Sequence, residues 1–114
     1  MIARLWFGAT RGEDGDAYVE YLERTGVPAH RSTSGNRGSL VLRRTVGDSA
    51  EFLVLSFWES EEAIEAFAGE DISKAIYFPA DDQFLTRRRD LIDHYEIVGG
   101  SADLSPAGSA ADDG

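Results

Sequence analysis

His94 is the side chain in this sequence best suited to acid–base chemistry. It sits between Asp93 and Glu96, and histidine is the side chain whose ordinary pKa lies closest to neutral pH. A general base that takes a proton from a bound substrate fits such a residue. A strand histidine that is hydrogen-bonded where two subunits meet fits it equally well. The other histidine, His30, follows Pro28, and we expect it at the exposed start of a strand.

Aromatic side chains are the second group that points to a ligand. Trp58 ends an apolar run, and Trp6 lies in the first apolar stretch of the chain. Both rings can stack on a planar ligand, although core packing explains them equally well, because aromatic side chains dominate buried area. We predict that Trp58 and Tyr77 contribute to catalysis beside His94, with Tyr77 or Arg37 orienting an oxyanion. The residues predicted to line the substrate pocket are Trp6, Phe67, Phe78, Tyr18, Arg37 and Asn36.

A turn rich in glycine, Gly35-Asn36-Arg37-Gly38, is a further candidate. The glycines allow positive φ, and successive backbone amides in such a turn can form a nest that binds an anion, with Arg37 beside it. A plain connection between two strands explains the same residues.

The composition excludes several kinds of site. The chain has no cysteine, which excludes disulfides, thiolate metal sites and a cysteine nucleophile. Its two histidines lie on different predicted elements without spaced carboxylates, so no metal site is predicted. No Gly-x-Gly-x-x-Gly follows a strand, so neither a nicotinamide nor a flavin site of that kind is predicted. We therefore expect no cofactor.

The formal net charge of −10 argues against nucleic-acid binding, which needs a basic surface. Arg87-Arg88-Arg89 is the only basic cluster; it fits an exposed strand edge, and a phosphate site is the alternative. No segment approaches the ~20 apolar residues of a membrane span, and the first residues do not resemble a signal peptide. We expect a cytoplasmic protein with no membrane partner.

Hydrophobic patterns and turn residues predict the order strand, helix, strand, strand, helix, strand. Asp14 or Asp16 is expected to begin the first helix, and Gly26 with Pro28 to end it. Ser60 is expected to cap the second helix, and Gly69 to close it. The predicted strands cover residues 2–10, 29–46 with a turn or bulge at 35–38, 50–58 and 87–98.

This order predicts the α+β class, with a ferredoxin-like unit whose antiparallel sheet carries both helices on one face. The strands supply apolar residues to both faces, as with Leu5 and Trp6, so the second face must also be covered. A second subunit that closes two sheets into a barrel is the economical solution, and we predict a homodimer. Residues 1–98 form the predicted domain, and residues 99–114, rich in Gly, Ala, Ser and Asp, a disordered tail.

Three segments resemble the antibiotic biosynthesis monooxygenase-like proteins, which are dimeric α+β barrels: Met1 to Trp6, Phe57-Trp58-Glu-Ser60, and His94-Tyr95-Glu96. The resemblance implies the same fold and the same dimer. In the best-understood members, dioxygen reacts with the carbanion of a phenolic or anthrone substrate without flavin, haem or metal, so the protein has only to deprotonate the substrate and hold the intermediate.

Carried over residue by residue, the resemblance is incomplete. Trp58 matches the tryptophan of the anthrone oxygenases, but Val54 stands where they have an asparagine, and Tyr77-Phe78 where they have an arginine. The haem-degrading branch uses an asparagine, a tryptophan and a histidine where this chain has Leu5 or a neighbour, Phe67 and Tyr77. Haem degradation is therefore not expected, because an axial ligand is missing.

The sequence thus favours a small dimeric enzyme, a cofactor-independent monooxygenase that uses dioxygen on an aromatic or polyketide-like metabolite. Two alternatives stay open. A dimeric ligand-binding or stress-associated protein would use the same pocket without chemistry, and an isomerase or cyclase would need the same base but no oxygen.

Overall fold

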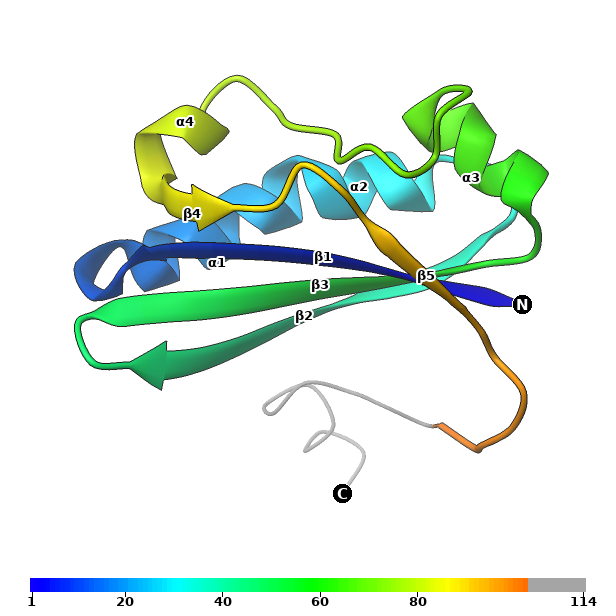
Figure 1. The fold of residues 1–114 in the computed structure, drawn as a ribbon. Helices are drawn as coiled ribbons and strands as arrows, with labels where there is room; N and C mark the ends of the chain where they lie inside the picture. Colours follow the sequence, from blue (N-terminus) through cyan, green and yellow to red (C-terminus); the bar gives the residue numbers. More distant parts are fainter. Residues whose placement is uncertain (103–114) are drawn as a thin grey trace.

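A computed structural model describes residues 1–102, and it has the predicted ferredoxin-like α+β fold (Figure 1). One antiparallel sheet carries all the helices on the same side. The sequence-based assignment to this fold class is confirmed. In chain order the elements are β1 (Ile2–Arg11), a 3₁₀ turn (Gly12–Asp14), α1 (Gly15–Arg24), α2 (Gly26–Arg31), β2 (Asn36–Val46), β3 (Ser49–Trp58), α3 (Glu61–Ala68), α4 (Asp81–Phe84), β4 (Leu85–Arg88) and β5 (Asp93–Glu96).

The sheet has the strand order β2-β3-β1-β4, and β5 also pairs with β1. All these pairings are antiparallel. The predicted hairpin between β2 and β3 is present, with Gly47 at its turn. Strand β1 is thus the centre of the sheet, because it pairs with β3 on one side and with both β4 and β5 on the other.

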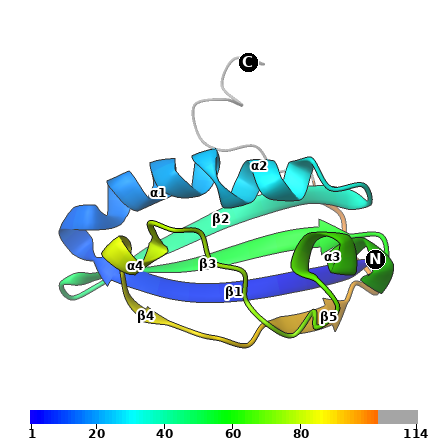
Figure 2. The same ribbon diagram turned by 90° about the horizontal axis from the view of Figure 1, so that it is seen from above.

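The core lies between the sheet and the helices. Alternate residues of β3 point towards the helices and are buried, while those between them point to the open face. Helices α1 and α2 follow one another along the sheet, α3 lies near the start of β1, and α4 lies near the opposite end (Figure 2). The main cluster of buried residues is Tyr18, Tyr21, Leu22, Ala50, Phe52 and Val54.

The prediction that residues 29–34 extend as a strand is wrong. The chain bends at Thr25 (φ −120°, ψ −80°) and continues as the short helix α2. Pro28 lies in the first turn of this helix, where backbone N–H groups have no partner within the helix, so proline is tolerated there. Consequently His30 is a buried helical residue, 7% exposed, and not the exposed strand residue that was expected.

Helix α3 begins and ends as its sequence predicts. The Ser60 hydroxyl accepts a hydrogen bond from the Ala63 amide at 3.1 Å, and Glu61 occupies the first turn. Gly69 follows the helix with φ +89°. By contrast, neither Asp14 nor Asp16 caps α1 through its side chain: Asp14 instead pairs with Arg11 in the 3₁₀ turn.

The predicted last strand, residues 87–98, is divided into two short strands. Between β4 and β5 the chain leaves β1 and bonds to the segment after α3: the Ala75 amide donates to Asp90 O at 2.9 Å, and the Ile92 amide to Ser73 O at 2.7 Å. That segment is therefore attached to the sheet edge, and it lies across the helix side of the sheet (Figure 1).

Residues 99–102 follow β5 without regular structure, and the rest of the predicted tail, 103–114, lies outside the described residues. No helix within residues 1–102 has the length and apolar character needed to cross a membrane.

Gly35 gives a test of how the start of β2 packs on α3. It has φ +90°, and a β-carbon there would lie 2.5 Å from the Ala63 β-carbon. Gly47 has φ +58°, but a β-carbon there would meet nothing within 4 Å. Gly47→Ala should lower the free energy of unfolding by about 1 kcal/mol, from backbone strain alone. Gly35→Ala should lower it by about 3 kcal/mol, because a steric clash is added. Urea unfolding of both variants measures this, and equal losses would contradict the contact with Ala63.

Candidate functional site

A cavity of about 60 Å³ lies between the helix side of the sheet, α1, α2 and the segment before α4. Its walls are mainly aromatic and aliphatic, with a few polar groups that belong to residues far apart in the sequence. The residues that line it are Arg4, Trp6, Tyr18, Leu22, Gly26, His30, Val54, Phe67, Ile76, Tyr77, Phe78, Asp81 and Ile92.

Five residues predicted at the substrate site or at the catalytic centre meet at this cavity: Trp6, Tyr18, Phe67, Tyr77 and Phe78. They come from β1, α1, α3 and the segment that follows α3. The Trp6 ring contacts two of the others, with centroids 6.1 Å apart for Trp6 and Tyr77 and 6.4 Å for Trp6 and Tyr18. The structure therefore gathers them around one space.

The Trp6 ring owes its position to two neighbours. A β-carbon on Gly8 would lie 2.2 Å from the Trp6 ring, so only glycine lets the indole lie along the strand. The Trp6 Nε1–H donates to the Tyr77 hydroxyl at 3.1 Å. Trp6 and Tyr77 thus fix one wall of the cavity.

The hydroxyls of the cavity tyrosines already have partners. The Tyr77 hydroxyl donates to Arg89 O at 2.5 Å, so it could donate to a substrate oxyanion only after giving up that bond. The Tyr18 hydroxyl donates to the Asp81 carboxylate at 2.9 Å. Burial and the nearby Asp81 carboxylate raise the pKa of Tyr18. In this arrangement both tyrosine hydroxyls therefore hold parts of the cavity wall in place.

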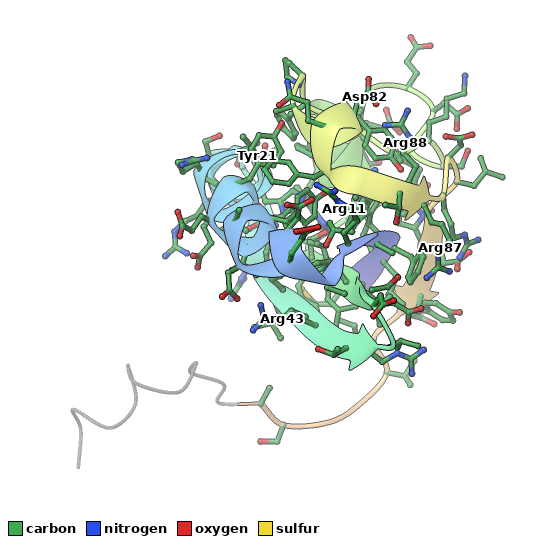
Figure 3. The ribbon with its side chains drawn as sticks, turned by 90° about the vertical axis from the view of Figure 1, so that its left-hand side faces the viewer. Arg11, Tyr21, Arg43, Asp82, Arg87 and Arg88 are labelled. Atoms are coloured by element: carbon green, nitrogen blue, oxygen red, sulfur yellow. The ribbon has the colours of Figure 1, made fainter. Side chains whose placement is uncertain are left out.

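The outer side of Tyr77 is covered by a cation. The Arg88 guanidinium lies 4.4 Å from the centre of the Tyr77 ring and forms an ion pair of 2.7 Å with Asp82; Figure 3 shows these two side chains near one another beside β4. Stacking of a cation on an aromatic face is favourable, so Arg88 helps to hold the cavity wall.

Trp58 lies one layer behind the cavity. It is fully buried, and its Nε1–H donates to the Ser56 hydroxyl at 2.8 Å. Its ring packs against Phe67 and His30, with both centroid distances 5.7 Å. In this position Trp58 supports two lining residues and does not face the ligand space itself.

His94 does not line the aromatic cavity. It lies in a separate surface depression with Ile2, Glu61 and Ile72. Its Nε2 is 3.0 Å from Arg4 Nη1. Because a guanidinium can only donate, Nε2 must accept, so the ring is neutral with its proton on Nδ1. Partial burial and the Arg4 charge lower the pKa of His94, in agreement with this assignment.

Arg4 is a polar cavity residue that the sequence analysis missed. Its side chain is almost fully buried, at 4% exposure. Besides the bond to His94, its guanidinium donates to Ile72 O at 2.6 Å and Lys74 O at 3.1 Å. Burial lowers the pKa of Arg4 to about 10, so the group is charged at neutral pH. The available signal was the alternation along β1, which places Arg4 on the same face as Trp6.

His30 is the second cavity residue that was missed. Its Nδ1 lies 2.8 Å from the Ser39 hydroxyl, and its ring packs edge-on against Phe67, with centroids 4.7 Å apart. Burial, with a smaller effect of Arg4, lowers the pKa of His30 to about 4. The imidazole in the cavity is therefore neutral near neutral pH.

Asn36 and Arg37 lie outside the cavity. The Asn36 side chain bonds the Gly38 amide and Phe57 O across a bulge at the start of β2, and Arg37 is exposed and pairs with Glu59 at 3.0 Å. Within residues 1–102, no group of three or more His, Asp or Glu side chains is placed to hold a metal ion.

Comparison with known proteins identifies the fold. The model of the antibiotic biosynthesis monooxygenase family matches residues 1–77. None of the curated proteins matches the chain. Among solved structures, a candidate antibiotic biosynthesis monooxygenase from Bacillus cereus has a TM-score of 0.64 at 18% identity and covers 92% of this chain and 98% of its own.

Two structures from Mycobacterium tuberculosis are also similar. Rv0793 has a TM-score of 0.58 at 13% identity and covers 89% of this chain and 98% of its own. The haem degrader MhuD, with two haems in its active site, has a TM-score of 0.56 at 19% identity and covers 90% of this chain and all of its own. At these identities the likeness concerns the fold.

The lowered pKa of His30 predicts a pH-dependent stability. Below its ordinary pKa of 6.5, the unfolded chain binds a proton that the folded protein does not bind until about pH 4. The stability associated with a neutral His30 is therefore present above pH 6.5 and lost as the pH falls towards 4, by up to about 3 kcal/mol. Urea unfolding of wild type and His30→Asn over this range should show a shallower decline for the variant. His94→Asn, at the less buried histidine, is the control, and its curve should stay closer to that of the wild type. Parallel curves for wild type and His30→Asn would contradict the prediction.

Proposed function

Because the chain belongs to the antibiotic biosynthesis monooxygenase family, we propose that it is a cofactor-independent monooxygenase for a small aromatic or polyketide-like metabolite. The observation that carries the proposal is the aromatic cavity with a buried guanidinium in its wall. Aromatic walls suit a planar substrate, and a fixed positive charge suits the anion through which such a reaction proceeds.

The proposed reaction needs only the substrate and dioxygen. Loss of a proton gives a resonance-stabilised carbanion, which passes an electron to dioxygen and then combines with the reduced oxygen. One oxygen atom stays in the product as a carbonyl and the other leaves as water, while the substrate carbon supplies the electrons. The protein has to remove a proton, hold the anion and exclude water.

Two imidazoles are candidates for the proton transfer. His94 was the base expected from the sequence, but it reaches the cavity only through Arg4. His30 lines the cavity directly. We therefore propose His30 as the proton acceptor closest to the substrate, with His94 positioning Arg4.

The size of the cavity sets a condition on this function. Pockets that bind small molecules usually measure about 300–1,000 Å³, and this one measures about 60 Å³. An aromatic substrate must therefore displace part of the wall. The segment from Ile76 to Phe78 is the part of the wall that belongs to no helix or strand. We propose that it moves outward on binding, which requires the Tyr77 hydroxyl to give up its bonds to Trp6 and Arg89 O.

Dioxygen consumption tests the proposal. Purified protein, treated with a chelator, is assayed with a panel of anthrones and hydroquinones, and we expect oxygen uptake with formation of the carbonyl product. Loss of a catalytic base typically lowers the rate about a hundredfold or more, so His30→Asn should do so if His30 is the base.

The variants distinguish the possible bases. If His94→Asn loses more of the rate of oxygen uptake than His30→Asn, the base is His94 and not His30. Arg37→Ala, which changes an exposed residue outside the cavity, is the control and should keep the wild-type rate. Tight binding of a panel compound without oxygen uptake would favour a binding protein, and its rearrangement without uptake would favour an isomerase or cyclase.

We also propose that the protein is a homodimer formed through the open face of its sheet. Cross-strand rows there are apolar: Leu5, Leu55 and Leu40 form one row, and Phe7, Leu53 and Leu42 the next. Leu42 and Leu53 are exposed by 40% and 38%, which is unusual for leucines that lie side by side. A second copy on this face would bury the rows and leave the cavity, on the other face, accessible.

Leu53→Glu tests this interface. Leu53 lies in the middle strand of the open face, so two carboxylates brought into a dimer there would be desolvated without partners. We expect the wild type to sediment as a dimer and Leu53→Glu as a folded monomer. Leu91→Glu, at a leucine 56% exposed outside these rows, is the matched control and should stay dimeric. A wild-type monomer would contradict the proposal.

A further inference from the structure

The buried guanidinium of Arg4 has no counter-ion among the residues that the structure describes. Eight ion pairs join side chains among residues 1–102, and none of them includes Arg4. Its partners are two backbone carbonyls and the neutral ring of His94. Burying an unpaired charge is unfavourable, so this arrangement is best explained by an anion that arrives with a ligand.

The guanidinium has donors left for such an anion. A guanidinium carries more N–H bonds than these three contacts use. Both bonds of Nη1 are occupied, whereas the Nε–H and the second N–H of Nη2 have no partner among residues 1–102. No side-chain nitrogen or oxygen in this part of the chain is both fully enclosed and unpaired, and Arg4 lines the cavity. The unpaired Nε is therefore not fully enclosed, and its N–H is open to a ligand.

The carboxylate nearest in the cavity wall does not fill this role. Asp81 also lines the cavity, but its oxygens accept from the Tyr18 hydroxyl at 2.9 Å and the Phe78 amide at 2.7 Å. It holds the segment before α4 in place, and it forms no ion pair with Arg4. The positive and negative groups of the cavity are thus kept apart.

The surroundings of Arg4 specify the kind of anion. The Phe67 ring centre lies 5.9 Å from the guanidinium carbon, and Trp6 is on the same face of β1 two residues further along. An oxygen bound to Arg4 would therefore be attached to a flat apolar group that packs on these rings. A phenolate or an enolate conjugated with an aromatic ring has this form.

We propose that Arg4 binds the ionised oxygen of an acidic phenol or enol, so that the ligand is held in the cavity as its anion. This inference deepens the proposed function and rests on it only in taking the cavity as the place where the substrate binds. It names Arg4, on β1, as the group that holds the anion, whereas the resemblance would put an arginine at Tyr77-Phe78. The task of Arg4 is to stabilise the electron-rich form that reacts with dioxygen. The proton released goes to a base or to water, and no oxidation is part of the binding step.

The negative net charge of the protein makes a preference for an anion a discriminating test of the Arg4 site. The chain has a net charge of −10, and a field of that sign repels anions in general. A preference for an anion over a neutral ligand of the same shape must therefore come from a local positive group.

4-Nitrophenol is a suitable probe, because it ionises near neutral pH and only its anion is yellow. Nitrobenzene serves as the neutral comparison. Equilibrium dialysis with the wild-type protein should give an affinity for 4-nitrophenolate about tenfold or more above that for nitrobenzene, the effect expected for a hydrogen bond to a charged group. The bound probe should ionise at a pH about one unit lower than free in solution.

Arg4→Met should remove both effects, and Arg4→Lys should keep part of them, since it retains the charge. Arg37→Met changes the net charge by the same amount at an exposed ion pair and should leave both effects intact. Equal affinities for 4-nitrophenolate and nitrobenzene in the wild type, or no binding of either, would overturn the inference without the need for any variant. A preference that survives in folded Arg4→Met would also overturn it.

The outcome is independent of the oxygenase assay. Preferential binding of the phenolate without oxygen uptake on any substrate would uphold the anion site and reject the oxygenase. Oxygen uptake with no anion preference would uphold the oxygenase and reject the anion site.

Discussion

The buried guanidinium of Arg4 is the interaction on which the arrangement of the site depends. It joins the central strand β1 to the segment after α3, through the carbonyls of Ile72 and Lys74, and to β5, through His94. The same parts of the chain contribute Trp6, Tyr77 and, just before β5, Ile92 to the lining of the cavity. Because neutral acceptors are its only partners among residues 1–102, the charge is oriented by the fold but not neutralised by it. Orientation without neutralisation is what a site for an anion requires.

The division of the last strand follows from the same region. A single strand over residues 87–98 would pair with β1 throughout and leave residues 73–75 without backbone partners. Instead the chain between β4 and β5 bonds to that segment, which brings Tyr77 within reach of Trp6 and of Arg89 O. The aromatic wall of the cavity is consequently held by backbone hydrogen bonds at the edge of the sheet.

Local signals were enough to predict the strands of the hairpin, helix α3 with its Ser60 cap, the fold class and most aromatic residues of the cavity. They failed where a tertiary contact decided the outcome. Pro28 reads as the end of a helix, but it also suits the first turn of a new one, and packing of His30 against Phe67 and Trp58 favours α2. His94 and Arg4 are paired across two strands, a contact that the spacing of residues along the chain does not reveal. The sequence showed which histidine had acidic neighbours, and the fold decided which one reached the cavity.

The two tryptophans of the chain occupy very different surroundings. The protein therefore has two intrinsic fluorophores that report on different parts of the structure. Trp58 is sealed in the core beside Ser56, so its emission reports on the integrity of the folded domain. Trp6 lines the cavity and bonds Tyr77, so its emission reports on what occupies that space. A change in one signal without the other separates ligand entry from unfolding in a single optical measurement, with no label attached.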